Sequence, residues 1–291
     1  MRGTVSQPKT ARNGGMSLQS PSQAVPIIVE VALNKTLYPA GEHHLIDHLE
    51  RLFSQWKQTV DVASVPGLSG NMLVTDGFYP HYTKQKIRLL FIGRETLEME
   101  GEDYIDVLFS AYKENRVAGT SLNSHQFHSL MLRLAWAVQN QLPPWEQVPS
   151  ASSLVHQLGV EGGFSFAFMN LSKFSNESGN WQVDRNLINS FISLSCPQVT
   201  SQFSTTNLIL KEIGLLAPDL IITMNIGEYF QRIGRFNPVE YGGDVSLYHL
   251  ELQDGKKVPV VDTHHFSAPG KSPQRDYYQP LVQLWPKLYI N

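Results

Sequence analysis

The fold is decided by residues 86–96, which read KIRLLFIGRET. Residues 87–92 are apolar except for Arg88, and the run stops at Gly93, after which charged residues follow. A short apolar run that ends in this way is typical of a buried strand in a parallel sheet. In open α/β sheets the ligand site lies outside the carboxyl ends of the strands. Glu95 is therefore placed where the chemistry of such a fold takes place.

Three more strands of this sheet are predicted further along the chain. Residues 163–171 (GFSFAFMNL) are almost entirely apolar and lead to Asn170, and residues 219–224 (DLIITM) form a second run. Residues 257–263 are predicted to pair with residues 245–252 in a hairpin, because the turn between these runs contains Asp-Gly. Polar side chains thus follow several predicted strands.

Apolar residues recur at helical spacing between these strands. The predicted helices cover residues 41–60, 104–115, 121–142, 186–216 with a break near Cys196, 226–234 and 276–288. Strands that alternate with helices favour a parallel sheet with helices on its faces. The predicted fold is α/β, a three-layer α/β/α arrangement around a central, mainly parallel four-stranded sheet.

The N-terminal region differs in composition from the rest of the chain. Residues 1–24 are rich in Gly, Ser, Gln, Pro and Thr, so we expect a disordered leader, and Met16 is an alternative start to Met1. Residues 25–291 are predicted to form a single α/β domain, because 42% of the chain is hydrophobic and a chain of this length can bury a full core.

Composition excludes several classes of protein. No apolar run approaches the roughly 20 residues of a membrane span, and the N-terminus lacks the apolar core of a signal peptide, so we expect a cytoplasmic protein. The single cysteine excludes a disulfide framework and a four-cysteine metal site within this chain. The net charge of -3 counts against tight non-specific DNA binding. We expect a monomer without a cofactor or a bound metal.

The carboxyl ends of three predicted strands carry Glu95, Asn170 and His265. Each has a structural explanation: Glu95 as a helix cap, Asn170 as a partner for loop backbone, and His265 as a packed loop residue. Together they suit hydrolysis of a bond to a nucleobase. A carboxylate can activate water, a carboxamide can both donate and accept to a heterocycle, and a histidine can stabilise developing negative charge.

The sequence around these three residues resembles a known family. The segments are FIGRET at residues 91–96, FMNLSK at 168–173 and THHFSAP at 263–269. In order and context they resemble the first, second and late motifs of the uracil-DNA glycosylase superfamily. The resemblance extends over residues 87–288, and it implies a core of that fold at about residues 86–288.

The resemblance also implies a role for each site residue. Glu95 matches the water-activating acid, although Asp or Asn is usual in the family. Asn170 would bind the pyrimidine edge, and His265 would polarise a carbonyl of the base. Phe109 is the aromatic implied to stack on the base, with Tyr104 as the second choice.

Phosphate contacts and a reaction are implied as well. Ser267, Lys271 and Arg275 would bind phosphates. The implied function is that of a DNA glycosylase, which hydrolyses the N-glycosidic bond of uracil or another deaminated or damaged base flipped into a pocket. The expected partner is DNA that contains such a base, or a small nucleotide-like ligand.

Alternatives to this function remain open at the level of sequence. One is a catalytically inactive member of the same fold that binds a nucleotide or nucleobase. Another is a metal-dependent hydrolase built on Asp262, His264 and His265, although adjacent histidines on a strand point to opposite faces. A third is an interaction protein that uses the leader and the aromatic C-terminal segment.

Overall fold

The computed structural model describes residues 35–177, 182–196, 207–242 and 245–288. All of these residues belong to a single unit of the chain. The predicted leader at residues 1–24 lies outside the described residues, so its disorder stays a prediction.

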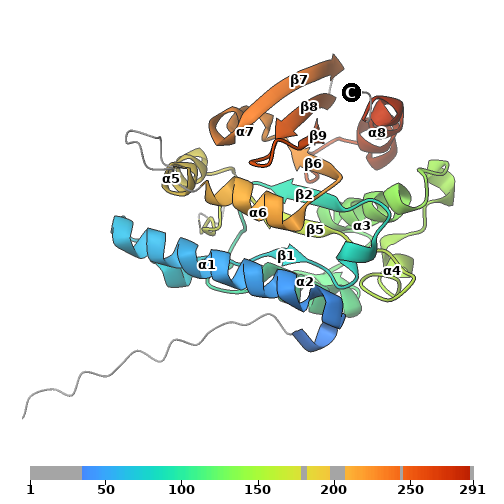
Figure 1. Cartoon of the computed structure of the whole chain (residues 1–291). Coiled ribbons are helices and arrows are strands. Elements are labelled where there is room, and N and C mark those ends of the chain that lie inside the picture. The colour runs from blue at the N-terminus through green and yellow to red at the C-terminus, as the bar shows by residue number, and fades with distance from the viewer. Residues whose placement is uncertain (1–34, 178–181, 197–206, 243–244, 289–291) are drawn as a thin grey trace, which may run out of the picture. The chain divides into compact units, whose positions relative to one another are not determined.

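A seven-stranded sheet in the order β1-β5-β2-β6-β9-β8-β7 organises this unit (Figure 1). At its centre β5, β2, β6 and β9 run parallel, whereas β1 pairs antiparallel at one edge and β8 and β7 pair antiparallel at the other. The strands are β1 (Gly77–Phe78), β2 (Leu89–Gly93), β5 (Ala167–Asn170), β6 (Leu220–Met224), β7 (Arg235–Gly242), β8 (Val245–Glu251) and β9 (Lys257–Thr263).

The α/β class is therefore confirmed, but the predicted count of four strands is wrong. The hairpin of β8 and β9 is present as predicted, and β7 extends it. β7 contains Pro238 next to an irregularity in the pairing, which an edge strand tolerates because one side of its backbone needs no partner. β1 has only two residues and therefore gives no periodic signal in the sequence.

Side chains on the two faces of the sheet belong to two separate hydrophobic cores. Along β2, Leu89 and Phe91 belong to one core and Leu90 and Ile92 to the other, because alternate residues of a strand point to opposite faces. The first core includes residues of α2 (Tyr104–Lys113), α3 (Gln126–Gln139), α4 (Ala151–Leu154) and α8 (Gln279–Leu284). The second includes residues of α1 (His43–Ala63), α5 (Arg185–Ser195), α6 (Leu208–Leu216) and α7 (Gly227–Ile233).

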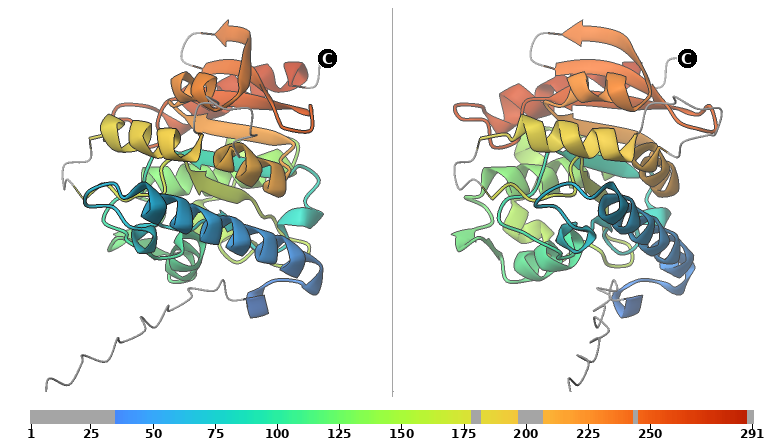
Figure 2. Two further views of the ribbon diagram at one scale, coloured as in Figure 1. Left: turned by 60° about the vertical axis from the view of Figure 1, so that its left-hand side comes forward. Right: turned by 90° about the vertical axis from the view of Figure 1, so that its left-hand side faces the viewer.

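Helices thus cover both faces of the sheet. In the right-hand view of Figure 2 the blue helix α1 lies on one side, and the green α3 and red α8 lie on the other. Short 3-10 turns cover Lys35–Leu37, Ala40–Glu42, Gly70–Met72, Tyr82–Lys84, Trp145–Gln147 and Trp285–Lys287. Among the described residues, none of the helices combines the length and the apolar character that crossing a bilayer requires.

Two predicted helices differ from what the structure contains. The helix predicted for residues 121–142 begins only at Gln126, because a small hairpin of β3 (Arg116–Val117) and β4 (Thr120–Ser121) precedes it. The helix predicted for residues 276–288 is divided into a π-helical turn at Pro273–Tyr278, α8 and a 3-10 turn. Proline lies in the first turn of each of these pieces, where the missing N–H breaks no helical hydrogen bond.

Candidate functional site

The carboxyl ends of the parallel strands bring the predicted polar residues to one edge of the sheet. Gly93 at the end of β2 pairs with Asn170 at the end of β5. The chain segments that follow run on side by side, since Leu171 N donates to Gly93 O at 3.0 Å and Ser172 N donates to Arg94 O at 2.8 Å. β9 ends at Thr263, two residues before His265.

Asn170 lies against the backbone of Gly93. A Cβ at position 93 would be 2.8 Å from Asn170 Oδ1 and 3.0 Å from Phe168 Cζ, so only glycine leaves room for this side chain. Asn170 is 3% exposed, and its Nδ2 has no hydrogen-bond partner within the described part of the chain. The amide is therefore a buried donor that a ligand can satisfy.

Glu95 is held by the start of α5. Its Oε1 accepts from the backbone N–H of Asp184 at 3.0 Å and from Asn176 Nδ2 at 3.4 Å. Burial raises the pKa of Glu95 above its ordinary value, although the Asp184 N–H and the charge of Arg94 oppose the shift. Oε2 is buried and accepts no hydrogen bond from a described residue. One oxygen thus fixes the carboxylate, and the other is available to a ligand or water.

His265 is a neutral ring with a defined tautomer. Burial, and after it the positive charge of Arg94, lower the pKa of His265 to about 4. The backbone N–H of Ser267 donates to Nδ1 at 3.3 Å, which assigns the single proton of the ring to Nε2. Tyr277 Oη donates to His265 O at 2.8 Å and holds the backbone. Nε2–H is therefore a donor for an acceptor atom of a ligand.

Two phenylalanine rings connect His265 with the environment of Asn170. The Phe127 ring lies 5.6 Å from His265 and 6.3 Å from Phe168, centroid to centroid. Phe127 is half-buried in the first turn of α3, whereas Phe168 is fully buried and stacks on Tyr104 at 4.6 Å. Phe127 is thus the aromatic beside His265 that retains exposed surface. In the sequence it belongs to the apolar stripe of α3, which indicates packing and not binding.

The structure does not bring Phe109 to this edge of the sheet. Phe109 is buried in α2, with its ring 5.5 Å from Tyr79 and next to Pro80 and Gly159. Pro80 follows β1, which runs antiparallel to β5, so these neighbours lie toward the amino end of β5 and away from Asn170. The side chain faces the core because its helix packs that stripe inward, whereas Phe127 lies beside His265.

The three residues implied to bind phosphate all lie in the segment after His265. Ser267 is exposed, and its backbone N–H is engaged by the His265 ring. Lys271 is half-buried. Arg275 is exposed and forms an ion pair with Asp276 at 2.9 Å. The guanidinium of Arg275 therefore has an acidic neighbour in place of an open anion site.

The carboxylate of Asp262 is bound by groups of two neighbouring elements, β6 and the start of α7. Its carboxylate accepts from Thr223 Oγ1 at 2.6 Å and from the backbone N–H groups of Ile226 and Gly227 at 3.1 Å, where α7 begins. In the described ranges no group of three or more His, Cys, Asp or Glu residues is arranged to hold a metal ion. No contact of Asp262 therefore supports the metal-dependent hydrolase.

Comparisons with known proteins identified no similar protein. No family model, curated protein or solved structure matched the chain significantly. Functional conclusions therefore depend on the geometry of the site.

Proposed function

We propose that this protein hydrolyses the N-glycosidic bond of a nucleobase, in the manner of a DNA glycosylase that acts on uracil or another deaminated or damaged base. A single observation carries the proposal. Three groups lie at or just after the carboxyl ends of parallel strands, at the edge where α/β folds bind ligands. They are a carboxylate with a buried oxygen and a buried amide donor, both without a partner among the described residues, and a neutral histidine.

The proposed reaction assigns one role to each group. Glu95 orients a water molecule and accepts its proton while the water oxygen bonds to C1′ of the sugar. The bond between C1′ and the base nitrogen breaks, and the base leaves with the electron pair as an anion. His265 Nε2–H and the Asn170 amide donate to atoms of the base that gain negative charge. The base stacks on Phe127.

Arg94 adds a positive charge to this arrangement. Its charge opposes the rise in the pKa of Glu95 that burial causes, and it adds to the lowering of the pKa of His265. The guanidinium is therefore within electrostatic range of both groups. Because His265 is neutral, Arg94 supplies the positive charge that favours an anionic leaving base. It also favours the ionised form of Glu95, which the reaction needs.

The test is release of a base from short oligonucleotides that carry uracil, hypoxanthine or xanthine, in single and double strands, with abasic sites as the readout. Glu95→Gln keeps the shape of the side chain and removes its charge, so we expect about a 10²–10⁴-fold loss of turnover. Binding of free base should stay within about threefold. Glu98→Gln, which changes an exposed carboxylate three residues away, is the matched control.

Two results would contradict the proposal. Full turnover in the Glu95→Gln protein would remove that carboxylate from the mechanism. Folded wild-type protein that forms no abasic sites and binds no free base would overturn both the reaction and the site.

Binding of a nucleobase or nucleotide without catalysis is the second candidate function. The observation that favours it is that Glu95 Oε1 already accepts the backbone N–H of Asp184, as a purely structural carboxylate would. Free-base binding by a wild-type protein that releases no base from any substrate would support this candidate over the first.

A further inference from the structure

Three charged side chains are buried together near the carboxyl end of β5. Lys173 Nζ lies 2.7 Å from Asp76 Oδ1 and 2.9 Å from Glu212 Oε2, and all three side chains are 0% exposed. The aromatic rings of Phe53 and Trp56 lie beside the ammonium, with their centroids 5.6 and 5.5 Å from Nζ. Such a cluster is costly to bury, and an apolar cluster of similar volume is often at least as stable. Fold stability alone therefore does not account for it.

Asp76 connects this cluster to the candidate site. Its Oδ2 accepts the backbone N–H of Asn170 at 2.7 Å. β1 pairs with β5 only through Gly77 and Phe78, so the ladder ends before it reaches Asn170. The Asp76 carboxylate takes the place of the missing strand partner, and it is the group that fixes the last residue of β5 on that side.

The charges of the cluster are unequal, since two carboxylates face one ammonium. Burial raises the pKa of Glu212 well above its ordinary value, while Lys173 opposes the shift and the charge of Asp76 adds to it. The charged form of Glu212 is therefore disfavoured, and Asp76 makes the shorter contact with Lys173. Both oxygens of Asp76 accept from Lys173 Nζ, at 2.7 and 2.8 Å, and Oδ2 also accepts from the backbone of Asn170.

We propose that Asp76 is a positioning residue that fixes Asn170 for binding a base, with Lys173 as its counter-ion and Glu212 as a second hydrogen-bonding partner of Lys173. This inference rests on the proposed function of the site. Asp76 touches no substrate and acts through Asn170. Charge-assisted hydrogen bonds are stronger than neutral ones, so loss of the Asp76 charge loosens Asn170 even where the shape is kept.

The test compares Asp76→Asn with Glu212→Gln, which is a matched pair of isosteric changes in one cluster. The readouts are native-state hydrogen exchange of the Asn170 backbone amide, the affinity for free uracil and hypoxanthine, and thermal stability. We expect Asp76→Asn to speed exchange at Asn170 at least tenfold relative to the Ile222 amide in β6, and to weaken free-base affinity about tenfold. Glu212→Gln should change both by less than threefold, because the Asp76–Lys173 pair remains.

A second variant covers the case in which Asp76→Asn does not fold. Asp76→Glu keeps the charge but displaces the carboxylate by one methylene, so we expect faster Asn170 exchange and weaker base affinity in a folded protein. Unchanged exchange and affinity in these variants, or equal effects of Asp76→Asn and Glu212→Gln, would overturn the inference. If wild-type protein neither binds nor releases a base, the proposed function fails, and hydrogen exchange still decides whether Asp76 holds Asn170.

Discussion

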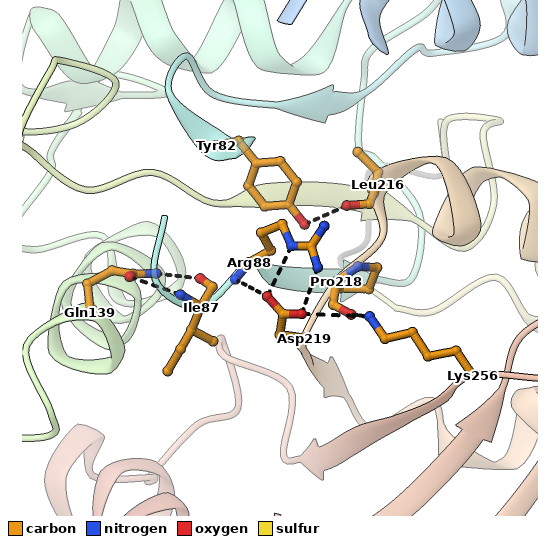
Figure 3. A network of polar contacts seen from close by, with 8 residues as sticks. All are labelled: Tyr82, Ile87, Arg88, Gln139, Leu216, Pro218, Asp219 and Lys256. Carbon is orange, nitrogen blue, oxygen red and sulfur yellow. Dashed lines mark hydrogen bonds and ion pairs between the residues drawn. The ribbon is translucent and has the colours of Figure 1, made fainter. Parts of the chain in front are cut away.

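The two ends of the parallel strands differ in how their polar side chains are hydrogen-bonded. At the amino end of β2, Arg88 donates from N and Nε to Asp219 Oδ2, each at 3.0 Å, and its second guanidinium nitrogen donates to Oδ1 at 2.8 Å (Figure 3). Lys256 Nζ bonds to Pro218 O at 2.9 Å beside this pair. The dashed lines of Figure 3 show a network in which the polar groups pair with one another. These contacts connect the residues just before β2 and β6, which are neighbouring strands of the sheet.

At the carboxyl ends, several buried polar atoms lack a hydrogen-bond partner among the described residues. Arg94 Nε, Glu95 Oε2 and Asn170 Nδ2 are buried, and the described residues provide no hydrogen-bond partner for them. Glu95 and His265 also have shifted pKa values. A buried polar group without a partner costs free energy, so its retention indicates a use outside the fold. The network of Arg88, Asp219 and Lys256, called the clamp below, thus differs from the candidate site at the other ends of the same strands.

A surface groove does not change this distinction. A groove of about 680 Å³ near the amino ends is lined by residues that include Lys84, Trp136, Gln139 and Gln157. Gln139 Nε2 donates to Ile87 O at 2.6 Å, and Trp136 Nε1 donates to Gln157 Oε1 at 3.3 Å. Gln139 and Trp136 thus already bond to other groups of the protein, whereas the described residues provide no partner for Asn170 Nδ2 at the opposite strand ends.

The largest effect is expected from adding a single methyl group at the carboxyl end of β2. Gly93→Ala places a Cβ 2.8 Å from Asn170 Oδ1, so the amide must move and base release should fall more than 100-fold. Overpacking should lower the free energy of unfolding by about 1–3 kcal/mol. Abasic-site formation and chemical denaturation measure the two effects.

Gly214→Ala is the matched control, because a Cβ in that position of α6 meets no atom within 4 Å. It should keep activity and leave stability unchanged or raised by roughly 0.5–1 kcal/mol. Wild-type activity in the Gly93→Ala protein would contradict the placement of Asn170.

A smaller effect is expected from acidic pH, and it should act at the carboxyl ends alone. Base release should fall as pH approaches the raised pKa of Glu95, whereas His265 stays neutral down to about pH 4. Although burial opposes it, hydrogen bonds from Arg88 keep the pKa of Asp219 below its ordinary value, so Asp219 should keep its charge at pH values where Glu95 loses its own. The pH profile of kcat/KM for base release measures the difference.

The direction in which stability changes with pH follows from the lowered pKa of His265. Between about pH 6.5 and pH 4 the unfolded state binds a proton at this residue that the folded state does not, so its contribution to stability falls as pH falls. A His265→Gln protein should lack that part of the slope. An unchanged dependence of stability on pH in the His265→Gln protein would contradict the lowered pKa of this histidine.

The smallest effect is expected at the clamp. Arg88→Met removes an ion pair whose side chains are 33% and 30% exposed, so the free energy of unfolding should fall by about 1 kcal/mol. Abasic-site formation should be unchanged at a temperature where the variant is folded. A tenfold loss of activity would show that the clamp affects the candidate site, and it would contradict the distinction between the two ends of the strands.

Much of this contrast is visible in the sequence. The buried runs that became β2, β5 and β6, and the polar residues Glu95 and Asn170 after two of them, were predicted from apolar periodicity and from the residues that interrupt it. These signals are local, because a strand shows its pattern within five to eight residues. The hairpin of β8 and β9 was equally local, since its turn contains Asp-Gly.

Other features depend on residues that are distant in the sequence. The seven strands could not be counted from the sequence, because neither β1 nor β7 has an apolar pattern that identifies it as a strand. The choice of Phe127 over Phe109 depended on which helix begins beside His265, because both residues lie on apolar helical stripes.

The sequence by itself determined the α/β class, the strands that carry Glu95 and Asn170, and the segment that carries His265, because each is written in a short stretch of chain. Only the tertiary structure decided which side chains meet there. Lys173 lies 97 residues from Asp76 and 39 from Glu212, and no local pattern links the three. Burial and long-range contact also set the charge of His265 and the shift of Glu95, since a pKa depends on neighbours that only folding assembles.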